Sequence, residues 1–135
     1  MKMQVLTRAS NTPGPALNAT ASLLVDTICR TVELGVTITD AAVAGEFTHL
    51  FCSPVTLDPV CADCGTEGRL RDHIERKVTD LPIVGHPTRL HVRVPRFTCD
   101  NIECETRIFQ QRMPALAEPR AKTTRRCSRW ILQRL

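Results

Sequence analysis

The sequence has few aromatic residues and no long apolar segment. Its 135 residues include four Phe, one Trp and no Tyr, so aromatic residues make up only 4% of the chain. No apolar run approaches the roughly 18 residues that a membrane-spanning helix needs. The N-terminal region lacks the charged-then-apolar order of a signal peptide, because polar residues and two prolines interrupt it. The composition therefore predicts a cytoplasmic chain with no membrane contact, whose thin core needs a staple such as a metal.

Lysine is scarce as well, and the basic residues are unevenly placed. Of the 18 basic residues, 15 are Arg and three are Lys. Residues 1–60 hold three basic and five acidic side chains, whereas residues 61–135 hold 15 basic and nine acidic ones. The planar guanidinium fork of Arg suits phosphate groups and guanine edges. The basic C-terminal half therefore indicates a polyanionic partner such as DNA.

The most informative residues are two cysteine pairs. Cys61 and Cys64 are separated by two residues and followed by Gly65. Cys99 and Cys104 enclose the turn-prone residues "DNIE". Two thiolates at such a spacing, with a Gly that permits a left-handed turn, are typical of a zinc knuckle. Two knuckles at one end of a β-hairpin would place four sulfurs around one structural Zn²⁺ per chain.

Other interpretations of the cysteines stay open at this point. A redox-active CxxC pair needs a preceding strand, a following helix and a βαβ context, whereas a Pro-rich connector precedes the first pair. Disulfides are disfavoured in a reducing compartment. His73 or His91 is an alternative ligand in place of one thiolate. Cys29, Cys52 and Cys127 fall on apolar stripes and are expected to be small core residues.

The N-terminal part of the chain is predicted to contain a leader, a helix and a hairpin. Residues 1–16 are rich in turn-forming residues and are expected to be a flexible leader. Two β-branched or aromatic segments on either side of Gly45 predict a hairpin, which completes a unit spanning residues 17–54. Before it, apolar side chains recur every three to four positions, which predicts an amphipathic helix. The stripe expected to be buried is Leu17, Ala21, Leu24, Ile28 and Val32.

Residues 55–112 are predicted to form the zinc-ribbon module. The segment "RLRDHIERKV" is interpreted as a strand, "TDLPIVGHP" as turns around a short apolar run, and "TRLHVRVPRF" as a second strand. In the second strand, Leu90, Val92 and Val94 alternate with basic side chains. We therefore expect one face of this strand to be buried and the other to be basic and wet.

Residues 113–135 are predicted to be a linker, bracketed by Pro114 and Pro119, and the start of a helix-turn-helix segment. The first helix of that segment is expected to be basic and amphipathic. Its apolar stripe would be Cys127, Trp130, Ile131 and Leu135, with Lys122, Arg125, Arg126 and Arg129 on the opposite surface. The fold class predicted from all these elements is α+β: a small zinc-ribbon β-module with an N-terminal helix and hairpin and a C-terminal basic amphipathic helix.

The cysteine-bearing segment resembles the N-terminal portion of ISL3-family insertion-sequence transposases. The resemblance rests on the CxxCG pair, on "DLPIVGHPTRLHVRVPRFTCDN", on the CxxxxC spacing, on the aromatic in "RIFQQR" and on the Arg-rich helix, and it spans residues 47–135. It implies a zinc-binding domain ahead of a helix-turn-helix that binds the terminal inverted repeats of the element. The zinc ligands that it implies are Cys61, Cys64, Cys99 and Cys104. Residues 120–135 would open the DNA-binding helices.

The resemblance also implies what this chain does not do. Family members continue into an RNase-H-like catalytic domain whose acidic residues bind divalent metal and cut DNA, and 135 residues leave no room for it. Asp80 and Asp100 fall within the predicted zinc module and are not expected to be catalytic. A zinc ion closed by four thiolates has no open coordination position. The expectation is therefore a truncated transposase, a separately encoded fragment or a stand-alone relative of the family, and in each case not an enzyme.

The leading functional hypothesis is a DNA-binding module for transposon ends. The residues expected to contact DNA, mostly at phosphates, are Arg69, Arg71, Arg89, Arg93 and Arg96 from the ribbon and Lys122, Arg125, Arg126 and Arg129 from the terminal helix. A second copy of the chain or the full-length transposase is a further candidate partner. The alternative hypothesis is a zinc-ribbon protein–protein interaction module or small regulatory protein, because the apolar stripe of the terminal helix needs a partner.

Overall fold

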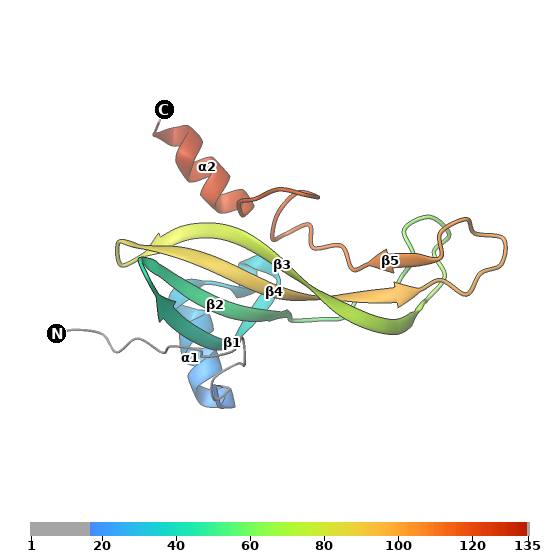
Figure 1. Cartoon of the computed structure of the whole chain (residues 1–135), viewed down its shortest axis with the longest axis horizontal. Coiled ribbons are helices and arrows are strands. Elements are labelled where there is room, and N and C mark those ends of the chain that lie inside the picture. The colour runs from blue at the N-terminus through green and yellow to red at the C-terminus, as the bar shows by residue number, and fades with distance from the viewer. Residues whose placement is uncertain (1–16, 135) are drawn as a thin grey trace.

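A computed structural model describes residues 17–134, so the predicted leader at residues 1–16 lies outside the described part. The predicted α+β class is confirmed: five strands form one sheet, and helices flank it (Figure 1). In chain order the elements are α1 (Ala19–Cys29), a 3₁₀ turn η1 (Val32–Leu34), β1 (Val36–Ala44), β2 (Phe47–Pro54), β3 (Arg69–Ile83), β4 (His86–Thr98), β5 (Ile108–Gln110) and α2 (Arg125–Gln133).

The predicted N-terminal helix is α1, and local capping explains its bounds. The side chain of Asn18 accepts a hydrogen bond from the backbone N–H of Ala21 at 2.8 Å, which satisfies one free donor of the first turn. Arg30 adopts a left-handed conformation, with φ of 55°, and ends the helix. The helix therefore stops before Val32, where the apolar pattern alone would have continued it.

The stripe that α1 buries is not the predicted one. Leu24, Ile28 and Val32 are 61%, 66% and 65% exposed, so their expected burial is wrong. Leu17, just before the helix, packs against the core as predicted, but the side chains of the helix itself that do so are Val25 and Cys29. The buried carboxylate of Asp26, next to Val25, fixes this orientation of the helix.

Asp26 ties α1 to the sheet. Its carboxylate is 7% exposed and accepts hydrogen bonds from the hydroxyls of Thr31 and Thr37 at 2.8 and 2.6 Å. It also accepts one from the backbone N–H of Ile38, in β1, at 2.7 Å. A buried carboxylate is costly unless it has such donors. Turning the helix to bury Leu24 would break these bonds, so the polar tether decides which face is buried.

The hairpin predicted around Gly45 is confirmed. β1 and β2 pair antiparallel, from Val36 opposite Pro54 to Ala44 opposite Phe47. Gly45 has φ of 62°, the left-handed value that a tight hairpin turn requires. A register shift between Ile38 and Asp40 marks a bulge in β1.

β3 and β4 form a long hairpin that runs the length of the molecule (Figure 1). The turn predicted over residues 79–87 is confined to Val84 and Gly85, both with positive φ, and β3 continues through Ile83. β3 is an edge strand in the order β1-β2-β4-β3, with β5 on the far part of β4, so Pro82 is tolerated in it. The expectation of a turn-rich segment from residue 79 was therefore wrong.

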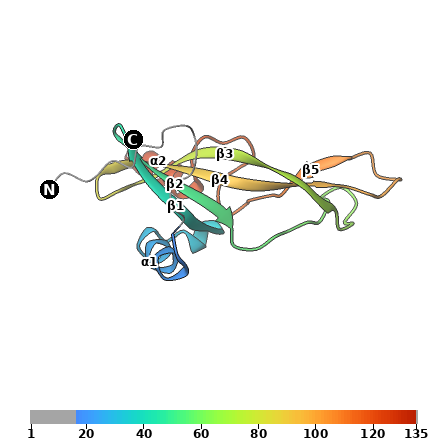
Figure 2. The same cartoon turned by 60° about the horizontal axis from the view of Figure 1, so that its bottom comes forward.

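The sheet has one covered face and one face that no described helix covers. Leu90, Val92 and Val94 point into the core, as predicted, and are at most 1% exposed. α1 packs on this core face through Val25 and Cys29 (Figure 2). The opposite face carries the alternate residues of β2, β3 and β4, and we call it the open face. β2 and β4 pair parallel, so residues 17–54 and the long hairpin share one sheet.

The predicted linker is part of the core. Met113, Leu116 and Ala117 are 8%, 0% and 2% exposed and pack against the core face. The chain then reaches the edge of β3, where the N–H of Thr79 donates to the carbonyl of Lys122 at 2.9 Å. Residues 113–119 are therefore a packed connection and not a free linker.

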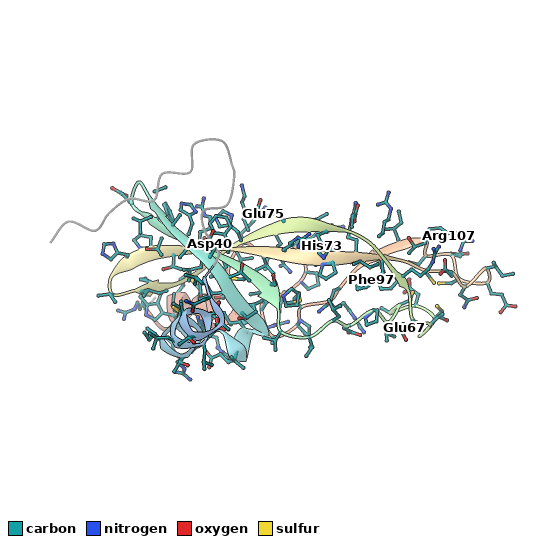
Figure 3. The ribbon with its side chains drawn as sticks, turned by 90° about the horizontal axis from the view of Figure 1, so that it is seen from below. Asp40, Glu67, His73, Glu75, Phe97 and Arg107 are labelled. Carbon is teal, nitrogen blue, oxygen red and sulfur yellow. The ribbon has the colours of Figure 1, made fainter. Side chains whose placement is uncertain are left out.

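A second, smaller cluster lies at the other end of the long hairpin. It consists of Cys61, Cys99 and Cys104, with Cys64 and Phe109 packed against it. Figure 3 shows Phe97 and Glu67 towards this end, away from Asp40 in β1. The molecule thus has two separate clusters joined by one pair of strands.

Candidate metal centre and basic surfaces

The first knuckle is a tight turn between Cys61 and Thr66. The N–H of Gly65 donates to the carbonyl of Cys61 at 2.8 Å, and the N–H of Cys61 donates to the carbonyl of Thr66 at 2.9 Å. Gly65 has φ of 74°, so the predicted left-handed turn after the second cysteine is present. The turn brings Cys61 and Cys64 to the same side of the loop.

The second knuckle closes on Asn101. The N–H of Cys104 donates to the carbonyl of Asn101 at 3.0 Å, and the side-chain oxygen of Asn101 accepts from the N–H of Glu103 at 3.0 Å. The guanidinium of Arg107 donates to the carbonyls of Cys104 and Asn101 at 2.8 and 3.3 Å. Arg107 was not among the predicted functional residues, and its role is to hold this loop.

Close backbone packing presses the two knuckles together. A Cβ atom on Gly68 would lie 2.8 Å from the carbonyl oxygen of Thr98 and 2.9 Å from a ring carbon of Phe109. Only glycine therefore fits at this crossing. The rings of Phe97 and Phe109 stack with centroids 5.5 Å apart, and Phe109 covers the cysteine cluster.

The four sulfurs form a compact group. All lie within 4.8 Å of one another, with 4.0 Å between the Sγ atoms of Cys61 and Cys104 and 3.6 Å between those of Cys64 and Cys99. Sulfurs that each bind zinc at about 2.3 Å in a tetrahedron lie about 3.8 Å apart. A disulfide would need about 2.05 Å. The geometry therefore fits a four-thiolate zinc ion and not a disulfide.

The local hydrogen bonds favour thiolate at one ligand and oppose it at another. The hydroxyl and backbone N–H of Thr66 lower the pKa of the Cys64 thiol to about 6. The backbone N–H of Asn101 lowers the pKa of Cys99, but burial and the neighbouring thiols outweigh it and raise that pKa. Four thiols this close cannot all ionise unless a cation compensates them. Zinc supplies that charge.

These observations define a four-cysteine zinc ribbon, closed and structural, with one zinc per chain. Residues 58–104 match the family described as the zinc-finger of transposase IS204/IS1001/IS1096/IS1165. This segment is accordingly an ISL3-type zinc-binding portion, as the resemblance implied. The match begins before Cys61 and ends on Cys104, so it encloses all four ligands. No curated protein and no solved structure matches the chain.

The other cysteines and the histidines lie outside the metal centre. Cys52 and Cys127 are 2% and 3% exposed in the core, and Cys29 packs against it, as predicted. Burial raises the pKa of all three thiols. His91 hydrogen-bonds Glu75 and a second histidine, and is not a zinc ligand. Within residues 17–134, the cysteine set is the one group of three or more His, Cys, Asp or Glu side chains able to share a metal ion.

Three ribbon arginines predicted to contact DNA form ion pairs. The guanidinium of Arg69 pairs with Asp100 at 2.6 Å. Arg96 and Arg71 both pair with Asp72, at 2.5 and 3.4 Å. These pairs lower the pKa of both carboxyl groups and offset the positive charge of the arginines. Asp100, at the zinc end, and Asp72 are thus structural partners.

The other two ribbon arginines lie on the open face. Arg89 stacks over the ring of Phe47, with its guanidinium carbon 4.5 Å from the ring centroid. Arg93 is exposed and lies opposite Glu75 in the β3–β4 register. Lys77, which the sequence did not single out, is also exposed and lies opposite His91 on the same face.

The terminal helix divides its basic residues between surface and interior. Lys122 and Arg129 are exposed, and Arg125 donates to the carbonyl of Pro114 and to Glu118. The side chain of Arg126 is only 10% exposed and points into the protein, so its predicted place on the outer basic surface is wrong. The predicted apolar stripe buries Cys127 but leaves Ile131 42% exposed.

The zinc end is acidic. Residues 58–69 and 99–107 contain two basic residues, Arg69 and Arg107, against six acidic ones: Asp58, Asp63, Glu67, Asp100, Glu103 and Glu105. Four thiolates on one Zn²⁺ add two further negative charges. The net charge of the whole chain is nevertheless +4. Counting charge by knuckle, and not by half of the chain, would have revealed this segregation from the sequence.

The described helices do not include a membrane span. No helix within residues 17–134 is long and apolar enough to cross a membrane.

Proposed function

We propose that this chain is a DNA-binding module that recognises the ends of an insertion sequence and does not itself cut DNA. The match of residues 58–104 to the zinc finger of transposases carries the proposal. A zinc ion held by four thiolates has no open position for water or substrate, so it serves the fold and not catalysis. The binding surface is built on the sheet strands over the main core, and the zinc ion closes the far end of the β3–β4 hairpin.

Charge assigns the DNA to surfaces away from the knuckles. The acidic zinc end would repel phosphates, whereas Arg89, Arg93 and Lys77 project from the open face and Arg129 from α2. Phosphate contacts by such side chains would supply most of the affinity and fix the register of the DNA. Arg69 and Arg96 are already paired with acidic groups, so they would contribute less to DNA binding.

The test is fluorescence anisotropy with labelled duplexes. One duplex carries the terminal inverted repeat of the element that encodes the chain, and the control duplex carries the same bases in scrambled order. We expect tighter binding to the repeat, and weaker binding as salt rises from about 50 to about 200 mM. Equal, salt-insensitive or absent binding to both duplexes would refute the proposal.

A protein-interaction module is the second candidate, and the exposed side of α1 favours it. Leu23, Leu24 and Ile28 on this helix and Val32 just beyond it are each more than three-fifths exposed. Exposed apolar side chains gathered on one helix in this way mark protein contacts. Self-association or partner binding through this surface would change little with salt, whereas DNA binding would weaken.

A further inference from the structure

The open face carries a continuous row of aromatic rings. Ring centroids are 6.2 Å apart between Phe47 and His49, 5.0 Å between His49 and His91, and 4.7 Å between His91 and Phe51. The row crosses the two central strands, β2 and β4. His91 and Phe51 are stacked, with 19° between their planes. On a sheet face that only meets water, we would expect polar side chains and not four neighbouring aromatic rings.

Hydrogen bonds hold the row in place. Glu75 contacts Nδ1 of His91 at 2.5 Å, and Nε2 of His91 lies 2.8 Å from Nδ1 of His49. One ring therefore orients the next, from β3 through β4 to β2. The same bond fixes the half-exposed carboxylate of Glu75, which lies opposite Arg93 in the β3–β4 register.

Cations flank the row. Arg89 covers Phe47 at one end, and Arg93 lies beyond His91 towards the other. Lys77 projects between them from β3. The rings thus form the middle of the surface and the cations lie around them. This arrangement suits a single nucleic-acid strand, whose bases stack on aromatic rings while its phosphates contact cations.

A hollow at the end of the row is large enough to take a base. Its volume is about 450 Å³, and its walls include Phe51, His73, His91 and Arg93. Duplex DNA keeps its bases stacked inside and offers a flat face only edges and phosphates. A single strand can turn a base out of its stack and place it against Phe51.

We infer that the open face binds unpaired DNA strands, with bases against the partly exposed rings of Phe47, His49 and Phe51, which His91 holds from below, and phosphates on Arg89, Arg93 and Lys77. This inference rests on the proposed DNA-binding function and adds the form of the DNA that this face takes. The exposed basic residues of α2 remain for duplex DNA. The chain would then hold a duplex and an opened strand on different surfaces.

The experiment compares a labelled oligothymidine strand of about 16 nucleotides, which cannot form a duplex with itself, with the inverted-repeat duplex. Anisotropy is measured for the zinc-loaded full chain and for Phe47→Ala and Arg93→Ala. Leu24→Ala and Arg112→Ala are the matched controls, because they remove an exposed apolar and an exposed basic side chain away from the open face. Zinc content and circular dichroism confirm that each variant is folded.

The expected result is binding of the single strand that weakens about tenfold in Phe47→Ala and several-fold in Arg93→Ala, with both controls unchanged. If Phe47→Ala does not fold, the exposed Arg93→Ala still gives the answer. Duplex binding with no single-strand binding, or with equal loss in controls and test variants, overturns the inference and leaves the proposed function standing. Absence of binding to both DNAs overturns both.

Discussion

Arg126 in α2 and Asp80 in β3 form a buried ion pair that holds the C-terminal helix on the sheet. The guanidinium contacts the carboxylate through two bonds, of 2.5 and 2.9 Å, and the two side chains are 10% and 1% exposed. Arg126 also donates to the carbonyl oxygens of Cys29 and Arg30, at the end of α1. A single side chain thus joins α2, β3 and α1, and Thr124 adds a hydrogen bond to Asp80 at 2.8 Å.

Removing this arginine should destabilise the fold. Arg126→Ala leaves the carboxylate of Asp80 buried without its counter-ion, which costs about 3–5 kcal/mol in other proteins. We expect a lower urea midpoint for Arg126→Ala, whereas Arg129→Ala, at an exposed position, should match the parent protein. An unchanged midpoint for Arg126→Ala would show that the ion pair does not hold α2 in solution.

The same helix offers a second comparison, in DNA binding. If α2 contacts phosphates, Arg129→Ala should lower the slope of log affinity against log salt by about one. Arg126→Ala, in the fraction that stays folded, should keep the slope of the parent protein because its side chain is turned inward. If the slope fell for Arg126→Ala and did not change for Arg129→Ala, the assignment of the two side chains would be reversed.

The metal centre could be predicted from the sequence because the residues that determine it are close together along the chain. Cys61, Cys64 and Gly65 form one turn, and the second pair forms another, so spacing alone specifies each knuckle. Arg126 could not be assigned in this way. Its partner Asp80 is 46 positions away, and an amphipathic pattern identifies a polar side chain without showing whether it meets water or a buried carboxylate.

The strand and helix boundaries show the same limit. Asp80 and Pro82 look like turn residues, but β3 lies at the edge of the sheet and accommodates both. The face that α1 buries depends on Asp26, whose hydrogen-bonding partners Thr37 and Ile38 come from the next strand. Hydrophobic spacing predicted that this helix exists, and tertiary hydrogen bonds decided how it is rotated.

That rotation can be tested with two substitutions in α1. Asp26→Ala removes the acceptor of three hydrogen bonds, two of them buried, and should lower the free energy of unfolding by several kcal/mol. Leu24→Ser, at a side chain 61% exposed, should change it by no more than about 0.5 kcal/mol. Urea unfolding of both variants measures this. A larger loss for Leu24→Ser than for Asp26→Ala would restore the predicted apolar stripe.

The crossing at Gly68 should be essential to the zinc end. Gly68→Ala places a methyl group against the carbonyl of Thr98 and the ring of Phe109, and such overpacking costs about 1–3 kcal/mol. We expect faster transfer of zinc to a chromogenic chelator, while Ala62→Ser, at an exposed knuckle position, should not change the rate. Equal rates for both variants would mean that the knuckles are not pressed together at this point.

The zinc ligands should control one end of the molecule and not the whole. Cys61→Ser removes a ligand from the smaller cluster, which is separate from the core under α1. Because metal binding and folding are coupled in such sites, we expect loss of zinc and faster amide exchange in residues 55–68 and 99–110, with the core strands still protected. Cys29→Ser, outside the metal centre, should retain both zinc and protection. Full protection of the knuckles in Cys61→Ser would contradict a structural role for the metal.

Native mass spectrometry of the chain purified without added zinc tests the central claim most directly, combined with alkylation of accessible thiols. The predicted result is one zinc per chain, with Cys61, Cys64, Cys99 and Cys104 protected from alkylation until a chelator removes the metal. A metal-free mass that is two hydrogens lighter for each cysteine pair would contradict it, because the four sulfurs would then be disulfides and the ribbon would have no zinc to close it.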